Sequence, residues 1–269
     1  MPKTRLDLLL VERGLAETRS KAQAIIMARQ VRVNGQMVDR AGATFAPEVQ
    51  VEVESGPRFV SRGGEKLQAA LEAFPVDPSG LICADVGAST GGFSDCLLQH
   101  GAAKIYAIDV GKGILHWKLR SDPRIVVMEG TNARYVESLP EPVQLVVCDA
   151  SFISLKTLLP VFSRWLLPSP SGRGAGGEGG CNVITLIKPQ FEAGRVDVAR
   201  GRGVVRDPEI HRKVLVDILA FVQTQGLGIR GLIRSPLKGP EGNIEFLAWL
   251  DRQKISADVS TLIENALSS

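Results

Sequence analysis

Short apolar runs alternate with helical patterns along most of the chain beyond residue 63. The runs that predict strands are 81–86, 104–109, 124–128, 143–148 and 183–187. The segments in which apolar residues recur with helical spacing are 65–73, 92–100 and 154–166. Such an alternation of strands and helices predicts an α/β domain in which helices cover both faces of a parallel sheet.

The last part of the sequence follows a different pattern. After a long helical pattern at 208–225, "IRGLIRSPL" and "NIEFLAWLD" flank "KGPEG", which predicts an antiparallel pair of strands. A mostly parallel, seven-stranded sheet finished by one antiparallel hairpin is typical of class I (Rossmann-like) methyltransferases, whereas dinucleotide oxidoreductases usually keep a parallel sheet. The low-complexity stretch at 168–180 is expected to be a flexible insertion without chemistry.

The N-terminal residues predict a small α+β domain of their own. A helix over 6–14 ends at a glycine, and a second helix begins after Thr18, whose hydroxyl caps it. A hairpin follows around Asn34-Gly35, and "VQVEV" predicts one more strand. Glycines and a proline in "SGPRFVSRGG" indicate a linker. The expected parts are a domain at 1–56, a linker at 57–62 and a larger domain at 63–269.

Composition and charge narrow the class of protein. The longest apolar runs fall far short of the ~18 residues of a membrane span, and no signal peptide is apparent, so we expect a cytoplasmic protein without a membrane partner. Four cysteines show no CxxC spacing and predict buried, reduced thiols and no metal site. Of the net charge of +3, residues 1–62 supply all the excess, with ten Lys/Arg against seven Asp/Glu, while residues 63–269 hold 22 of each. A polyanionic partner is therefore expected at the small domain, although the charge alone is equally compatible with a solvated basic face.

The arrangement of a helix, a basic helix and a short hairpin resembles the S4-like RNA-binding domain, named after a ribosomal protein. The resemblance implies that the second helix and the hairpin face the RNA backbone. Any one of the candidate residues could be an ordinary surface residue, but together they favour recognition of phosphate and shape over reading of bases. These candidates are Arg5, Arg19, Ser20, Lys21, Arg29, Arg32 and Asn34.

The glycine-rich turn in "ADVGASTGGFSDCLLQ" separates a strand from a helix. Ser89 replaces the second glycine of the dinucleotide fingerprint, and no Gly-Lys-Ser/Thr follows, so both phosphate-binding interpretations weaken. A carboxylate before the turn, Asp85, and another after the second strand, Asp109, suit S-adenosylmethionine, which has a ribose and an ammonium but no phosphate. The alternative is that Asp85 only caps a turn. The predicted cofactor-binding residues are Asp85, Gly87, Ser89, Thr90, Gly91, Gly92, Phe93, Asp109 and Asn132, the last reading the adenine.

Polar residues interrupt three apolar strands near their ends, namely Asp149, Lys188 and Glu245. Since the carboxyl ends of strands face the ligand crevice in open α/β sheets, we expect these side chains to converge there. Lys66, in the first turn of the helix after the linker, is expected to join them. The alternative is a structural ion pair between Asp149 and Lys188.

Five motifs, "SRGGEKL", "DVGASTGGF", "CDASFISL", "LIKPQFE" and "GNIEF", follow the S4-like domain in this order. Together they resemble the motifs of the TlyA family. This family, also named haemolysin A, comprises ribosomal RNA 2′-O-methyltransferases with an FtsJ-like catalytic domain. The resemblance implies a catalytic set of Lys66, Asp149, Lys188 and Glu245. It also implies that "PRFV", with Arg58 and Phe59, is a linker connected with cofactor binding. The insertion at 168–180 departs from the family's compact loop.

The expected reaction is methylation of a ribose 2′-hydroxyl, of cytidine by the resemblance, in RNA of the small ribosomal subunit, with the large subunit as a second candidate substrate. Lys188 is expected to orient the hydroxyl and stabilise the developing alkoxide, while Asp149 and Glu245 fix both lysines; a neutral Lys188 acting as a base is the alternative. A non-catalytic ribosome-assembly factor, a haemolysin and a nicotinamide oxidoreductase are the competing functions. We expect a monomer, because one chain supplies both domains.

Overall fold

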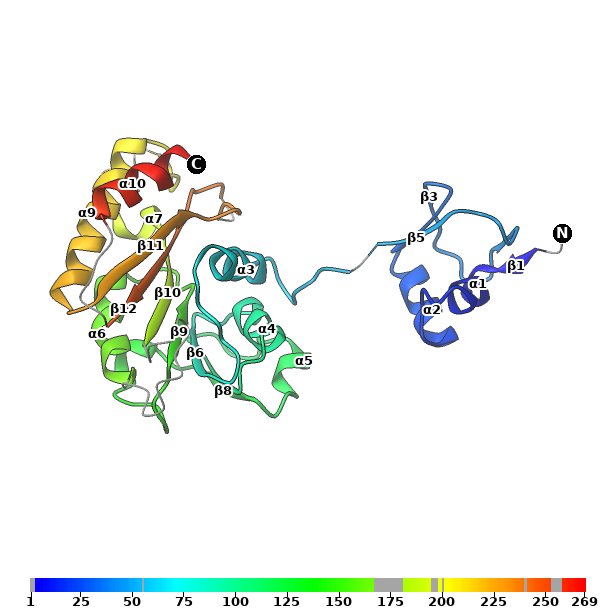
Figure 1. Ribbon diagram of the computed structural model, residues 1–269, viewed down its shortest axis with the longest axis horizontal. Coiled ribbons are helices and arrows are strands. Elements are labelled where there is room, and N and C mark those ends of the chain that lie inside the picture. Colours follow the sequence, from blue (N-terminus) through cyan, green and yellow to red (C-terminus); the bar gives the residue numbers. More distant parts are fainter. Residues whose placement is uncertain are drawn as a thin grey trace. The chain divides into compact units, whose positions relative to one another are not determined.

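The computed structural model describes residues 3–54, 56–166, 181–194, 198–199, 201–239, 241–252 and 258–269 (Figure 1). The chain forms two compact units, residues 1–58 and 59–269, each with a core of its own. The predicted insertion at 168–180 lies outside the described residues. The two units are therefore described separately below.

The N-terminal unit packs two helices, α1 (Leu6–Glu12) and α2 (Arg19–Met27), against short strands. The core contains Leu6, Leu10, Ala22, Ile26, Val31 and Val33. The hydroxyl of Thr18 accepts the backbone N–H of Lys21 at 3.2 Å, so the predicted cap begins α2. Three strands lie in the order β3 (Gln36–Met37), β2 (Val31–Val33) and β5 (Val51–Val53).

The turn between β2 and β3 has the predicted form. Asn34 and Gly35 have φ angles of +52° and +77°, the left-handed conformation that a tight primed turn requires at both central positions. A further pair of two-residue strands, β1 (Thr4–Arg5) and β4 (Thr44–Phe45), was not predicted. Strands this short carry no detectable alternation in the sequence.

The larger unit is built on a seven-stranded sheet, as predicted. Its order is β11-β12-β10-β9-β6-β7-β8, and only β12 is antiparallel to its neighbours. The bounds are β6 (Ile82–Val86), β7 (Lys104–Asp109), β8 (Ile125–Glu129), β9 (Leu145–Cys148), β10 (Asn182–Ile187), β11 (Gly228–Arg234) and β12 (Phe246–Asp251). The predicted antiparallel pair is thus present, and its second strand is inserted next to β10.

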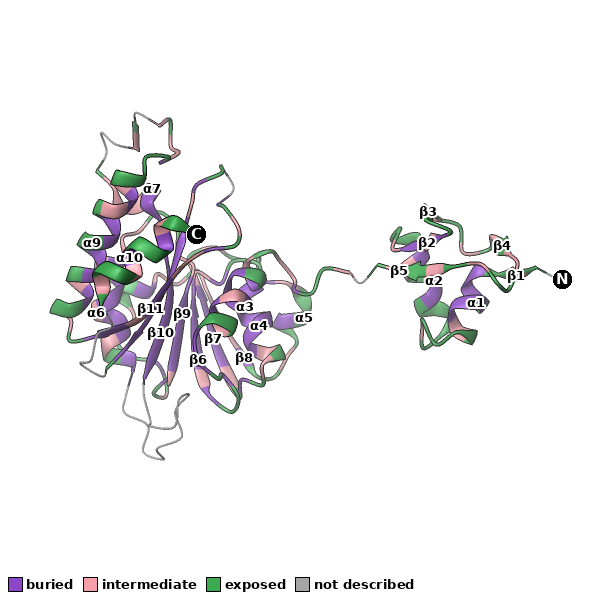
Figure 2. Ribbon diagram, turned by 45° about the horizontal axis from the view of Figure 1, so that its top comes forward, coloured by how far each residue is buried: buried purple, intermediate pink, exposed green. Residues whose placement is uncertain are grey.

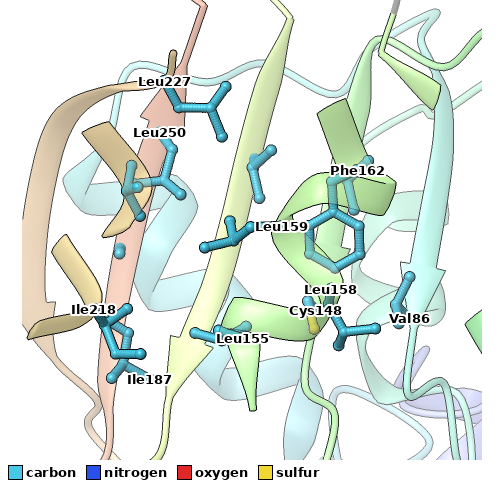
Figure 3. Packing of buried hydrophobic residues seen from close by; sticks show 14 of the residues in the cluster. Val86, Cys148, Leu155, Leu158, Leu159, Phe162, Ile187, Ile218, Leu227 and Leu250 are labelled. Carbon is cyan, nitrogen blue, oxygen red and sulfur yellow. The ribbon is translucent and has the colours of Figure 1, made fainter. Parts of the chain in front are cut away.

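Helices cover both faces of the sheet, which makes three layers (Figure 2). One face carries α6 (Leu155–Trp165), α9 (Pro208–Thr224) and α10 (Val259–Ser268); the other carries α3 (Gly63–Ala73), α4 (Gly92–Gln99) and α5 (Trp117–Arg120). Strand residues alternate between the two cores: in β9, Val146 and Cys148 face the α6 side, and Leu145 and Val147 face the α4 side. Figure 3 shows Leu155, Leu159 and Phe162 of α6 packed among strand residues of the first core.

Three short elements were not predicted, namely α5, η1 (Ala133–Tyr135) and α7 (Pro189–Glu192), and neither was the ten-residue helix α10. The four cysteines are buried and none of them is in a disulfide bond, as predicted. Among the described residues, no helix combines the length and the apolar composition that crossing a membrane requires.

Candidate active site

Four charged side chains from distant parts of the sequence meet at one edge of the sheet. Asp149 follows β9 directly, and Lys188 follows β10 directly, so both stand at carboxyl ends of parallel strands. Glu245 precedes β12, and it reaches the same edge because β12 runs antiparallel. The expectation that Glu245 stands at the end of a strand is corrected in this respect. Lys66 comes from the first turn of α3.

These side chains form a continuous chain of alternating charge. The ammonium nitrogen of Lys66 lies 2.6 Å from Glu245 Oε2 and 3.7 Å from Asp149 Oδ2. The ammonium of Lys188 lies 2.6 Å from Asp149 Oδ1. Glu245, Lys66 and Lys188 are all buried, and Asp149 is partly exposed. Alternation lowers the cost of burying three of these charges, since each lysine has a carboxylate beside it.

Two neutral side chains complete this cluster, and neither was predicted. Ser151 Oγ accepts a hydrogen bond from Lys188 Nζ at 2.9 Å, and the Asp149 backbone oxygen accepts another at 3.2 Å. Gln190 Nε2 donates to Glu245 Oε1 at 3.1 Å. Both residues lie two positions after a predicted member, in "CDASF" and "LIKPQ", and that proximity was the available signal.

Two cavities meet beside Asp149. The larger, of about 450 Å³, is lined by residues that include Asp109, Asn132, Ser151 and Phe152. The smaller, of about 310 Å³, is lined by residues that include Lys66, Thr90, Gly92 and Phe93. Gly87, Ser89 and Asp149 line both. A cavity of this size is large enough for a nucleoside-sized ligand.

The turn after β6 brings the backbone unusually close to β9. Gly87 has φ +83°, and a Cβ there would lie 2.9 Å from backbone atoms of Asp149 and Ala150. Ser89 has φ +49°, so a serine adopts the left-handed conformation at the position where the dinucleotide fingerprint has glycine. Its backbone N–H donates to Asp109 Oδ2 at 2.8 Å, which connects the turn to the end of β7.

We predict that Gly87→Ala disturbs both stability and the site. The new methyl group collides with backbone, which cannot rotate away, and it adds the strain of a positive φ; we expect a loss of about 2–3 kcal/mol in the free energy of unfolding. Urea denaturation measures it. Gly80→Ala is the matched control, because Gly80 has φ +72° but no atom lies within 4 Å of the place that its new methyl group would take. Equal losses in the two variants would refute the close approach to β9.

Asp85 lies beneath the site and lines neither cavity. Its side chain is fully buried, Oδ2 accepts the Ser94 hydroxyl at 2.7 Å, and Oδ1 has no hydrogen-bond partner among the residues that the structure describes. Burial raises the pKa of Asp85 to about 7, with the nearby carboxylates of Asp149 and Asp109 acting in the same direction. The sequence predicts that Asp85 contacts the cofactor, because the alternation of side chains along β6 does not reveal that Ser94 covers the Asp85 carboxylate.

The raised pKa predicts a pH-dependent stability. Between about pH 4 and pH 7 the folded protein keeps a proton on Asp85, whereas the unfolded chain, with an ordinary pKa of 3.8, has already released it. Stability therefore falls as pH rises through this window and levels off above it. Asp85→Asn should remove this contribution, so its stability relative to the unaltered chain should increase from pH 5 to pH 8. A constant difference in urea denaturation across that range would contradict the raised pKa.

The other predicted cofactor residues are distributed around the cavities. Asp109 and Asn132 line the larger cavity; Asp109 Oδ1 accepts the Gly111 N–H at 2.7 Å, and Asn132 Oδ1 accepts the Arg134 N–H at 3.2 Å. Gly91 lines neither and begins α4 with φ +97°.

Glu129 is a further residue that the sequence did not single out. It accepts backbone N–H groups of Gly113, Ile114 and Leu115 at 2.9–3.1 Å, and Arg120 at 2.8 Å. Hydrogen bonds from Arg120 and the backbone lower the pKa of Glu129 to about 2. Ile114 lines the larger cavity. Glu129 therefore fixes the loop on that side of it.

The predicted linker is divided between the two units at Arg58 and Phe59. Phe59 is buried and covers Gly64, where a Cβ would lie 2.3 Å from its ring. The Val60 N–H donates to Asp95 Oδ2 at 2.8 Å, and Ser61 lines the smaller cavity. The segment after residue 58 is thus fastened to α4, the helix that follows the glycine turn.

The predicted RNA-binding residues lie on the N-terminal unit. Arg5 and Arg19 share one carboxylate, Asp7. Lys21, Arg29 and Arg32 each pair with a different exposed acid, respectively Glu17, Asp39 and Glu54. Ser20 is exposed, and Asn34 accepts the Gln50 N–H at 3.0 Å. In the described part of the whole chain, no group of three His, Cys, Asp or Glu side chains could hold a metal ion.

Comparison with known proteins identifies the family of this chain. Residues 59–252 match the FtsJ-like methyltransferase family and residues 4–51 match the S4 domain. The chain is 41% identical over 269 residues to the 16S/23S rRNA (cytidine-2'-O)-methyltransferase TlyA of Mycobacterium tuberculosis, covering 98% of this chain and 96% of that protein. It is 40% identical over 247 residues to Hemolysin A of Brachyspira hyodysenteriae, covering 91% and 98%. A solved structure of a hemolysin-named protein from Streptococcus thermophilus matches with TM-score 0.72 and 40% identity, covering 100% of this chain and 95% of that one. The chain therefore belongs to the TlyA family, in which an S4 domain precedes an FtsJ-like methyltransferase domain.

Proposed function

We propose that this protein methylates the 2′-hydroxyl of a cytidine ribose in ribosomal RNA, with S-adenosylmethionine as the methyl donor. The proposal is carried by the alternating chain Glu245, Lys66, Asp149 and Lys188: Lys66 and Asp149 line the cavities, and Glu245 and Lys188 pair with them from buried positions. Two relatives that align with most of this chain are named for that activity. One name specifies RNA of both subunits, and the other specifies RNA of the large subunit.

The residues around the cavities fit the cofactor. Asp109 and Asn132 line the larger cavity, and we assign the ribose hydroxyls to the Asp109 carboxylate and the adenine to the Asn132 amide. Gly87, Ser89, Thr90, Gly92 and Phe93 provide the small or apolar wall for the methionine part. When bound, the cofactor supplies an electrophilic methyl group, so the chain's own task is to position an oxygen and to assist loss of its proton.

We assign the positioning of that oxygen to Lys188. Three enzyme oxygens lie within 3.2 Å of its Nζ, and an ammonium has three N–H donors. Two of these contacts are hydrogen bonds and the one to Asp149 Oδ1 is an ion pair, and we infer that an incoming 2′-hydroxyl replaces one of the two hydrogen bonds. The Ser151 hydroxyl is uncharged and belongs to an exposed residue, so it is the group to be displaced, and it marks the position of the substrate oxygen. The ammonium then stabilises negative charge on that oxygen as its proton leaves to water.

The remaining members of the set hold Lys188 in place. Asp149 contacts both lysines, and Glu245 balances the charge of Lys66 on the far side of Asp149. Fixed geometry of this kind is worth several kcal/mol of the reaction barrier, about 7–11 in ideal cases. The N-terminal unit brings the RNA, and we expect the protein to act as a monomer in the cytoplasm.

Transfer of a labelled methyl group tests the proposal. Purified protein is incubated with labelled S-adenosylmethionine and isolated small or large ribosomal subunits, and the RNA is digested to nucleosides. Label is expected in 2′-O-methylcytidine. Binding of subunits without transfer would instead indicate a non-catalytic assembly factor, and lysis of erythrocytes without transfer would indicate a haemolysin.

A further inference from the structure

The N-terminal unit buries one acidic side chain. Asp7 is fully buried, whereas the other six acidic residues among residues 1–58 are exposed. A buried carboxylate is costly unless charged partners and hydrogen bonds satisfy it. Its partners therefore indicate why it is retained.

Three side chains converge on Asp7 from two elements. Arg5, in β1, donates from Nε to Oδ1 at 3.0 Å and from its terminal nitrogen to Oδ2 at 2.9 Å. Arg19 Nε and Gln23 Nε2, both on α2, donate to Oδ2 at 3.0 Å and 2.9 Å. The hydrogen bonds from Arg5 are the main reason that the pKa of Asp7 lies far below its usual range. The carboxylate is ionised, and it connects β1 to α2.

The two arginines retain most of their hydrogen-bonding capacity. A guanidinium has five N–H donors. The contacts with Asp7 use two on Arg5 and one on Arg19, and both side chains are about half exposed, 43% and 53%. Two cations around one carboxylate leave a net positive charge, whereas Lys21, Arg29 and Arg32 are each balanced one to one by an exposed acid. Among these five cations, the positive charge that no carboxylate balances is therefore shared by Arg5 and Arg19, around Asp7.

We propose that Asp7 is a positioning residue that holds Arg5 and Arg19 together as a pre-formed clamp for one RNA phosphate. The proposal rests on the proposed function, because it takes RNA as the ligand. Two guanidiniums fixed on a shared carboxylate lose less conformational freedom on binding than two free ones, and their outward N–H groups match phosphate oxygens. No contact of Asp7 with the RNA is required.

The sign of the effect separates positioning from simple charge. Asp7→Asn makes the unit more positive, so a purely electrostatic role predicts tighter binding to RNA. Positioning predicts weaker binding, because the amide cannot hold two guanidiniums. Gln23→Ala is the matched control: it removes a donor from the same carboxylate but leaves the two charged contacts.

Equilibrium binding of the full chain to ribosomal subunits at several salt concentrations tests the proposal, with thermal melting as a folding check. We expect Asp7→Asn to weaken binding about 10-fold and to reduce the salt dependence by about one phosphate contact, while Gln23→Ala stays within about 2-fold. Unchanged or tighter binding by Asp7→Asn would overturn the clamp.

A second variant keeps the proposal testable if Asp7→Asn fails to fold. Arg19→Lys preserves the charge on a half-exposed side chain but removes the planar fork that contacts carboxylate and phosphate together. We expect a loss of about 5-fold or more, and retained affinity would overturn the proposal. The methyl-transfer assay tests the proposed function separately. If the unaltered chain binds subunits but transfers no methyl group, the proposed function is wrong, and the binding affinities of the variants still test the clamp.

Discussion

Lys188→Ala is expected to reduce methyl transfer to ribosomal RNA to background while S-adenosylmethionine still binds. The variant removes the ammonium that contacts Asp149 and Ser151, two residues that line the larger cavity, and with it the charge that we assign to stabilising the reacting oxygen. Loss of one such donor costs about 100- to 1000-fold in kcat. Single-turnover transfer measures the loss, and calorimetric titration measures cofactor binding.

Lys156→Ala serves as the control for this variant. Lys156 pairs at the surface with Asp217, at 2.7 Å, and not with a carboxylate of the site, so its removal should leave transfer unchanged. A Lys188→Ala enzyme that retains kcat within about 5-fold would contradict the assigned role. Equal loss of cofactor affinity and transfer would show that Lys188 acts in binding instead.

Glu245→Gln is expected to lower both stability and activity. Glu245 is 1% exposed and balances Lys66 at 2.6 Å, so the neutral amide leaves a buried ammonium with only the more distant Asp149. Breaking a buried pair costs about 3–5 kcal/mol, and the remaining contact with Asp149 places the expected loss near the lower value. Calorimetric unfolding measures the stability, and the transfer assay measures kcat.

Glu141→Gln provides the comparison for a surface pair. Glu141 contacts Lys104 at 2.5 Å with both side chains about one third exposed, and such pairs contribute about 0–1 kcal/mol. The Glu245 variant should therefore melt several degrees below the Glu141 variant. Equal melting temperatures would show that the buried chain of charges does not stabilise the sheet edge.

Hydrophobic patterning predicted the sheet well, because long buried strands carry a strong signal. β7 occupies 104–109 as predicted, and β10 begins one residue early. Elements of two to four residues, such as β1 and α5, were missed because they span only about one period of the pattern, so no apolar position can recur within them. The position of β12 between β10 and β11 depends on tertiary packing, which local patterns do not contain.

The candidate site was predictable where strand ends determine it. Asp149 and Lys188 meet because adjacent parallel strands end at one edge. The role of Asp85 was less predictable, since its burial depends on Ser94, nine residues later on α4. Asp7 was missed for a similar reason: in the sequence Arg5 and Arg19 are separate cations, and only folding places a shared carboxylate between them.

The central claim is that this chain methylates ribose in ribosomal RNA through Lys188. Mapping of 2′-O-methylated nucleotides in ribosomal RNA tests it most directly, in cells that have the protein, lack it, or carry only the Lys188→Ala variant. Specific methylated cytidines are expected to disappear when the protein is absent and to be restored by the unaltered chain but not by the variant. An unchanged methylation map in cells without the protein, or full restoration by Lys188→Ala, would contradict it.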